Sequence, residues 1–257
     1  MKIITKDPIN ETKNKLCIVT GIHGNEAFLF EYLKDNLNEL KLESIEIKLI
    51  LANQLAAERS IRCIDQDLNR SFNSIEDNHE TKLAKALLKT IEGNLILDLH
   101  THTSEEQFSL VSKENKEKMK NFIQCLGFKH SIIIPNELTK KSSLIENFNN
   151  SISIEVGSHN SQESVNCAKE VINQAINYLN GEIKKKDVKF LLAKEFVYNN
   201  ADKKLITDSA VENFVKICKD QYLNEKTAAD ESFIPVLVSR NVEPGRKILL
   251  KCTEENK

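Results

Sequence analysis

The sequence lacks several features that would point to a particular class of protein. Its apolar runs stop short of the roughly 18 residues of a membrane-spanning helix, and residues 1–13 have no apolar centre like that of a signal peptide. Basic and acidic residues nearly balance, 36 against 38 for a net charge of −2, and no long basic run occurs. We therefore expect a soluble cytoplasmic protein whose partners include neither a membrane nor a nucleic acid.

Cysteine pairs with the two-residue spacing of zinc knuckles and redox motifs are also missing. The six cysteines are scattered along the chain, at Cys17, Cys63, Cys125, Cys167, Cys218 and Cys252. This distribution is typical of small buried side chains in a reducing compartment, so we expect no disulfide. At 257 residues the chain can bury a core without one, either as one large domain or as a main domain with a smaller second one.

Strand and helix patterns alternate over the first 180 residues. Short runs of apolar residues predict strands at 16–20, 45–51, 95–99, 130–134 and 151–156. Apolar residues at helical spacing predict helices at 27–40, 80–91, 116–126 and 160–179. The alternation predicts an α/β fold in which helices flank a sheet that contains parallel strands.

The pattern changes near residues 184–187. Beyond them we expect short strands at 188–197, 233–238 and 247–250, a helix at 209–218 and a turn at Pro244-Gly245. The sequence thus predicts a main α/β domain of residues 1–185 and a small β-rich domain of residues 186–257.

Polar residues with the chemistry of metal ligands follow two of the predicted strands. His23 and Glu26 come just after the first strand, and their spacing lets one tight loop aim both at the same point. His100 follows the strand at 95–99, which can lie beside the first strand in a parallel sheet. Two imidazoles and one carboxylate leave a fourth position for water, as in hydrolytic zinc sites. We therefore expect one Zn²⁺ per chain.

Three further residues complete a candidate catalytic site. Glu155, at the end of another strand, is the candidate base that takes a proton from the metal-bound water and passes it to the leaving amine. The polar stretch at 52–78 is long for a loop in a compact domain, and such loops are usually functional. Within it, Arg62 could stabilise the oxyanion and Arg70 could grip a substrate carboxylate through two hydrogen bonds.

The remaining polar residues near these motifs have less defined roles. Asp98 would share a strand face with His100 and could orient it, and the sequence leaves open whether Asp98 or His102 supports the metal. Asp65 and Asp67 are expected to support the loop. No functional role is expected for the other three histidines, His79, His130 and His159.

Four motifs together resemble one family. They are GIHGNE at 21–26, RCIDQDLNR at 62–70, DLHT at 98–101 and IEVG at 154–157. In order and spacing they resemble the succinylglutamate desuccinylase/aspartoacylase family, relatives of the zinc carboxypeptidases. The resemblance implies a mixed, largely parallel sheet flanked by helices and zinc-dependent hydrolysis of the amide bond of an N-acyl amino acid.

The resemblance also implies roles for individual residues. It makes zinc ligands of His23, Glu26 and His100, a carbonyl-polarising group of Arg62 and a general base of Glu155. Asn69 and Arg70 would hold the substrate carboxylate.

Some positions depart from the family pattern. Aspartoacylases carry an arginine where this chain has Ile145, and the nearest cations here are Lys140 and Lys141. Residues 105–110 look more like the desuccinylase branch, although the arginine usual before that stretch is absent, as is the tyrosine that aspartoacylases use near residues 235–246. We therefore expect a broader or different amino-acid preference than strict N-acetylaspartate.

Two other functions fit the same residues. A zinc carboxypeptidase would share the metal and the base but would act on unmodified peptides, and a non-catalytic binding protein could retain the fold without activity. The sequence leaves open the acyl group, the amino acid, and whether the chain forms a homo-oligomer.

Overall fold

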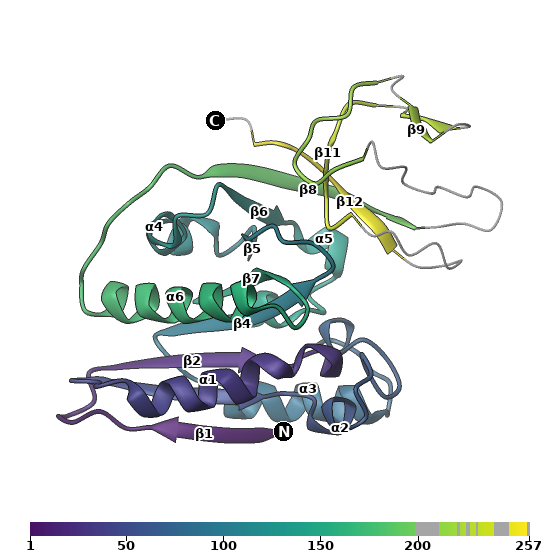
Figure 1. Cartoon of the computed structure of the whole chain (residues 1–257). Helices are drawn as coiled ribbons and strands as arrows, with labels where there is room; N and C mark the ends of the chain where they lie inside the picture. Colours follow the sequence, from purple (N-terminus) through teal and green to yellow (C-terminus); the bar gives the residue numbers. More distant parts are fainter. Residues whose placement is uncertain (199–210, 220–221, 225–226, 230, 239–246, 256–257) are drawn as a thin grey trace.

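A ten-stranded mixed sheet organises the molecule. The structure, a computed structural model, describes residues 1–198, 211–219, 222–224, 227–229, 231–238 and 247–255. The strand order across the sheet is β1-β3-β2-β4-β7-β5-β6-β8-β12-β11. Figure 1 shows β1 at one end of the molecule and the C-terminal strands β8, β11 and β12 at the other.

Four neighbouring strands of this sheet run parallel to one another, and the predicted metal ligands and Glu155 lie at the ends of three of them. The four strands are β3 (Ile45–Leu51), β2 (Asn14–Thr20), β4 (Leu95–His102) and β7 (Ser151–Ser158). Alternate residues of β2 enter different cores: Leu16 and Ile18 pack on one face of the sheet, whereas Cys17 and Val19 pack on the other. Burial on both faces explains why the sequence of β2 is apolar almost throughout.

Helices cover both faces of this part of the sheet. Apolar side chains of α1 (Phe28–Glu39), α4 (Lys116–Leu126) and α6 (Gln162–Leu179) form the core on one face. Those of α3 (His79–Thr90) pack on the opposite face. The predicted α/β architecture with a mixed, largely parallel sheet flanked by helices is therefore confirmed.

Sequence analysis missed several short elements. Strand β1 (Lys2–Lys6) runs antiparallel to β3 at the edge, and β5 (Phe108–Ser112) lies between β7, to which it is antiparallel, and the parallel β6 (His130–Ile134). The polar stretch at 52–78 contains the short helices α2 (Gln54–Glu58) and η2 (Leu68–Arg70). Three more short helices are η1 (Gly24–Glu26), α5 (Asn136–Thr139) and η3 (Leu144–Glu146).

Strands after residue 186 extend the same sheet. β8 (Lys189–Tyr198) pairs in parallel with β6, then β12 (Lys247–Glu254) and β11 (Ile234–Val236) follow in antiparallel order. The short strands β9 (Tyr222–Asn224) and β10 (Thr227–Ala228) form a separate pair. The content of this region is thus β-rich, and the domain boundary at 185/186 stays a prediction.

One expectation for the C-terminal region is wrong. Within the predicted helix at 209–218, the described residues 211–218 contain turns and a single bridge from Ile217 to Phe233. Ile217 is buried in a small apolar cluster with Phe233 and Val211, so tertiary packing sets the backbone here rather than the helical spacing of apolar residues. The turn predicted at Pro244-Gly245 lies outside the described residues. None of the helices in the described part of the chain combines the length and the apolar character that crossing a membrane would require.

Candidate metal centre and active site

The candidate site lies at the carboxyl ends of β2, β4 and β7. Glu155 of β7 is directly opposite His100 of β4 in the parallel register, and His23 and Glu26 follow the end of β2. Gly24 lets this last segment pack against α2, because a Cβ there would come within about 2.5 Å of the backbone of Ala56 and Ala57. The strand order therefore brings together residues that are more than 130 positions apart in the sequence.

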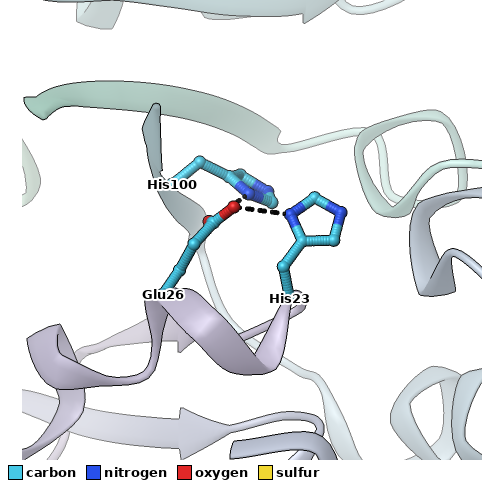
Figure 2. A group of neighbouring side chains, drawn as sticks. All are labelled: His23, Glu26 and His100. Carbon is cyan, nitrogen blue, oxygen red and sulfur yellow. Dashed lines mark hydrogen bonds and ion pairs between the residues drawn. The ribbon is translucent and has the colours of Figure 1, made fainter. Parts of the chain in front are cut away.

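The three predicted zinc ligands form one buried cluster. His23, Glu26 and His100 each offer a ligand atom within 4.8 Å of the others. Glu26 lies between the two imidazoles: its Oε1 is 2.7 Å from Nδ1 of His23 and its Oε2 is 3.0 Å from Nδ1 of His100. Figure 2 shows both rings directed toward this carboxylate from different parts of the chain. The main-chain amide of Thr101 also donates to Oε2 of Glu26.

A second acidic residue lies behind each histidine. Nε2 of His23 is 3.1 Å from Oδ1 of Asp67, and Nε2 of His100 is 2.9 Å from Oδ2 of Asp98. Such carboxylates fix the orientation of an imidazole and raise its basicity as a metal ligand. Asp98 therefore lies where the sequence suggested, in a position to orient His100. Asp67, which was expected only to support the loop, lies against His23 in the site.

The electrostatics of the cluster keep its central carboxylate ionised. Burial by itself would raise the pKa of Glu26, but the neighbouring His23 and His100 outweigh it and hold that pKa well below its usual range. A buried carboxylate and two imidazole nitrogens, each backed by an acid, form a donor set that fits a zinc ion. The cluster is therefore a candidate metal centre.

Glu155 lines the same cavity as the metal centre. Its side chain is buried, and its Oε2 has no hydrogen-bond partner among the described residues. A buried carboxylate oxygen without a partner is costly, so its presence calls for an explanation such as a catalytic role. Glu155 lies next to His100 of the adjacent strand, and its role as a base stays a prediction.

The predicted substrate-contacting residues also line this cavity, whose volume is about 520 Å³. Nη2 of Arg62 donates to Oδ2 of Asp67 at 2.7 Å, and its Nη1 lies 4.0 Å from Glu26. Arg70 donates to the carbonyl of Asn69, and its guanidinium lies 5.5 Å from the centre of the Phe196 ring. The structure thus brings Arg62, Asn69 and Arg70 to one cavity with the metal centre.

Apolar side chains form much of the remaining wall. They include Leu110, Ile134, Ile145, Leu237, Val238 and Leu250. Ile145, at the position where the family resemblance led us to expect an arginine, is therefore part of the cavity. Lys140 and Lys141 are not among the described residues that line it, and Nζ of Lys141 instead lies 3.3 Å from Glu114.

The histidines outside the cluster differ in their surroundings. Both ring nitrogens of His102 are engaged, Nε2 with the carbonyl of Glu106 and Nδ1 with the hydroxyl of Ser104, which favours a structural role. His130 stacks on Phe214. His159, for which no role was expected, lines the cavity, and only its position after the IEVG motif could have indicated this.

Comparisons with known proteins agree with the motifs. A 33% identical segment of 162 residues, 57% of this chain and 54% of the relative, matches a protein of Prochlorococcus marinus subsp. pastoris named "Probable aspartoacylase". A Xenopus laevis protein named "N-acyl-aromatic-L-amino acid amidohydrolase (carboxylate-forming)" is 35% identical over 107 residues, 35% of each chain. The matched segments therefore span about half of the first relative and a third of the second.

Solved structures show the same fold at low sequence identity. The crystal structure of a succinylglutamate desuccinylase/aspartoacylase from Rhodobacter sphaeroides superposes with a TM-score of 0.77 at 14% identity, covering 99% of this chain and 89% of that one. Murine aminoacylase 3 gives 0.72 at 17% identity, covering 96% and 97%. Residues 12–177 match the family described as the succinylglutamate desuccinylase/aspartoacylase catalytic domain. With more than half of its length in that match, the chain belongs to the succinylglutamate desuccinylase/aspartoacylase family.

Proposed function

We propose that this chain is a zinc-dependent amidohydrolase that cleaves the amide bond of an N-acyl amino acid to a carboxylate and a free amino acid. One observation carries the proposal. A buried His23, Glu26 and His100 cluster, a carboxylate oxygen of Glu155 without a partner, and arginines suited to bind anions meet in a single cavity. The names of the aspartoacylase and amidohydrolase relatives support the same reaction class.

The chemistry divides between the metal and the chain. Zinc bound by two imidazoles and a carboxylate supplies a Lewis acid that polarises a carbonyl and acidifies water. Glu155 takes a proton from the attacking water and delivers it to the leaving nitrogen, so that the amine departs neutral. Arg62 stabilises the negative charge that develops on the carbonyl oxygen, and its bond to Asp67 holds the guanidinium near the cluster.

Asn69 and Arg70, in the second half of the polar stretch at 52–78, are the candidate substrate-binding residues. Arg70 is the candidate partner for the α-carboxylate, because a planar guanidinium can make two parallel hydrogen bonds to it, with the Asn69 amide beside it. The position of Ile145 in the cavity wall supports a preference that is not restricted to acidic side chains. Burying an apolar substrate side chain against an apolar wall favours binding, whereas an aspartate carboxylate finds no partner there.

A substrate panel tests the proposal. It contains N-formyl, N-acetyl and N-succinyl derivatives of acidic, neutral and basic amino acids, the C-terminal amide of each, and unmodified dipeptides. We expect the zinc-loaded protein to hydrolyse acyl amino acids with a free carboxylate and to lose most activity on the amides. Preference for dipeptides would instead indicate a carboxypeptidase, and no turnover with retained binding would indicate a binding protein.

Two results would contradict only the substrate assignment. A preference for N-acetylaspartate of roughly a hundredfold over every neutral substrate, about 2.7 kcal/mol, would mean that a cation reads the side chain despite Ile145. Full activity on the amides would remove the role given to Arg70.

A further inference from the structure

His159 lies at the reacting end of the cavity, although no motif marks it. Its main-chain amide donates to the carbonyl of His102 at 3.0 Å, which ties the start of the segment after β7 to the end of β4. Gly157, two residues before it, has a φ of +117°, a conformation that favours glycine, and it lies where the register between β4 and β7 shifts. The backbone of His159 is therefore fixed by the same two strands that carry His100 and Glu155.

One nitrogen of the His159 ring is held by the protein. Nδ1 lies 2.7 Å from Oγ1 of Thr101, whose side chain is buried. The main-chain amide of the same Thr101 donates to Oε2 of Glu26. Thr101 thus connects the orientation of the His159 ring to the metal centre through one residue.

The other ring nitrogen is available to a bound molecule. The ring lines the cavity, and Nε2 has no hydrogen-bond partner among the described residues. If the Thr101 hydroxyl donates to Nδ1, Nε2 carries the proton and is a donor; if Nδ1 donates, Nε2 is an acceptor. In both tautomers one hydrogen bond of His159 is left for a ligand.

The hydrogen bonds of His159 place it near the metal centre. Burial lowers its pKa, and the ionisable side chains that act on this pKa are those of Glu26, His102, Glu155 and Arg62. These include the candidate base and the candidate oxyanion group. The carboxylate-binding end is marked instead by Arg70, which lies against the ring of Phe196.

We propose that His159 is a specificity-determining residue for the acyl half of the substrate, which it hydrogen-bonds through Nε2 while Thr101 holds Nδ1. The inference rests on the proposed function, since it presumes that an acyl amino acid binds with its carboxylate toward Arg70. It assigns the acyl group to the part of the cavity bounded by His159 and the metal centre. Side-chain selection stays with the wall around Ile145.

Two substitutions of His159 by amide side chains distinguish the roles of its two ring nitrogens. The side-chain amide of His159→Asn can reach Thr101 from the position of Nδ1 but leaves nothing at Nε2, whereas that of His159→Gln reaches the position of Nε2. With zinc content and melting temperature as controls, we expect His159→Asn to lower kcat/KM roughly tenfold, the effect of one lost hydrogen bond. His159→Gln should recover most of that loss. Thr101→Val keeps the hydrogen bond from the main-chain amide of residue 101 to Glu26 but removes the partner of Nδ1, so it should also lower kcat/KM.

The substrate series decides what His159 reads. In His159→Asn the N-succinyl form of one amino acid, whose distal carboxylate can accept a hydrogen bond from Nε2, should lose kcat/KM relative to its N-formyl and N-acetyl forms. The ratios among amino acids with one acyl group should not change. Calorimetry supplies a readout apart from turnover: in a zinc-loaded Glu155→Gln background, His159→Asn should weaken binding of an N-succinyl amino acid.

Contrary results are distinguishable. An active wild type whose His159→Asn and Thr101→Val variants keep its acyl ratios would overturn the assignment of His159 and leave the proposed function intact. Altered amino-acid ratios with constant acyl ratios would also overturn it. If the wild type neither hydrolyses nor binds any member of the panel, the proposed function itself fails. Should His159→Asn not fold, Thr101→Val, which removes the partner of Nδ1, gives the same decision.

Discussion

Asp67 lies behind His23, with its Oδ1 3.1 Å from Nε2 of the imidazole, while its second oxygen accepts a hydrogen bond from Arg62 at 2.7 Å. Burial would raise the pKa of Asp67, but His23 and Arg62 outweigh it and hold that pKa well below its usual range. One ionised carboxylate thus orients a candidate metal ligand and a candidate oxyanion-stabilising group. Asp67 therefore couples the candidate metal centre to the polar stretch at 52–78 that carries Arg62.

Asp67→Asn should therefore weaken both functions at once. An amide preserves the shape but not the charge, so the basicity of His23 falls, and we expect zinc affinity to drop roughly 10- to 100-fold, as for other residues behind a metal ligand. Chelator competition measures this affinity. The matched control is Asp65→Asn. Among the described residues the side chain of Asp65 accepts a hydrogen bond only from the amide of His79, at 2.8 Å, and does not contact the cluster. Equal zinc affinities for the two variants would contradict the role of Asp67.

The metal centre itself makes a stoichiometric prediction. Purified protein should hold about one zinc per chain, and His100→Ala or Glu26→Ala should strip it, because losing one of three protein ligands weakens binding steeply. Metal analysis after dialysis gives the occupancy, and His79→Ala serves as the control because His79 lies outside the cluster. Wild-type occupancy in either ligand variant would show that the metal binds elsewhere.

Glu155→Gln should separate chemistry from metal binding. The substitution removes the proton acceptor and leaves His23, Glu26 and His100 unchanged, so turnover should fall by roughly two orders of magnitude or more, as expected for loss of general acid/base catalysis. Single-turnover kinetics and zinc content are the measurements. Near wild-type turnover would mean that another residue is the base.

The buried strands and the polar residues that follow them could be predicted because each is encoded in a short stretch of sequence. Leu16 and Ile18 on one face of β2, and Cys17 and Val19 on the other, make an apolar run that predicts a buried strand without knowledge of its neighbours. The polar residues after such strands then had to meet at one edge of the sheet, and the structure brings His23, Glu26 and His100 together.

Contacts that depend on loop conformation could not be predicted in this way. The bond from Asp67 to His23 joins a loop to a strand end 44 positions away, and no periodic pattern encodes it. His159 reaches the cavity because of its bond to Thr101, 58 positions earlier. The predicted helix at 209–218 failed for a related reason, since Ile217 pairs with Phe233 in a separate apolar cluster.

A further loop contact of this kind centres on Glu80, at the start of α3. Its buried carboxylate accepts main-chain hydrogen bonds from Ile64, Asp65 and Gln66 at 2.7 to 3.3 Å, and a fourth from the Asn53 side chain. The three main-chain donors lie between Arg62 and Asp67, so Glu80 fixes the conformation of the loop that carries both. Burial would raise its pKa, but the four hydrogen bonds outweigh it and lower the pKa below its ordinary value of 4.5.

Glu80→Gln should destabilise the protein, because the NH₂ group of glutamine would face main-chain N–H groups that need an acceptor. We expect the free energy of unfolding at pH 7 to fall by about 2–3 kcal/mol, the loss of charge-assisted hydrogen bonds to a buried group. Urea denaturation measures it, with exposed Glu39→Gln as the control, for which a change within about 0.5 kcal/mol is expected.

The stabilising contribution of Glu80 should decrease as the solution becomes acidic. Because the pKa of Glu80 is lower in the folded than in the unfolded protein, its stabilising contribution is present in full above the unfolded value of 4.5 and is lost as the pH falls through the folded value. The difference between wild type and Glu80→Gln should therefore be constant from pH 7 to about pH 5 and should narrow in more acidic solution. A difference that widened on acidification would mean that Glu80 is protonated in the folded protein, and the hydrogen bonds of the loop would then need another acceptor.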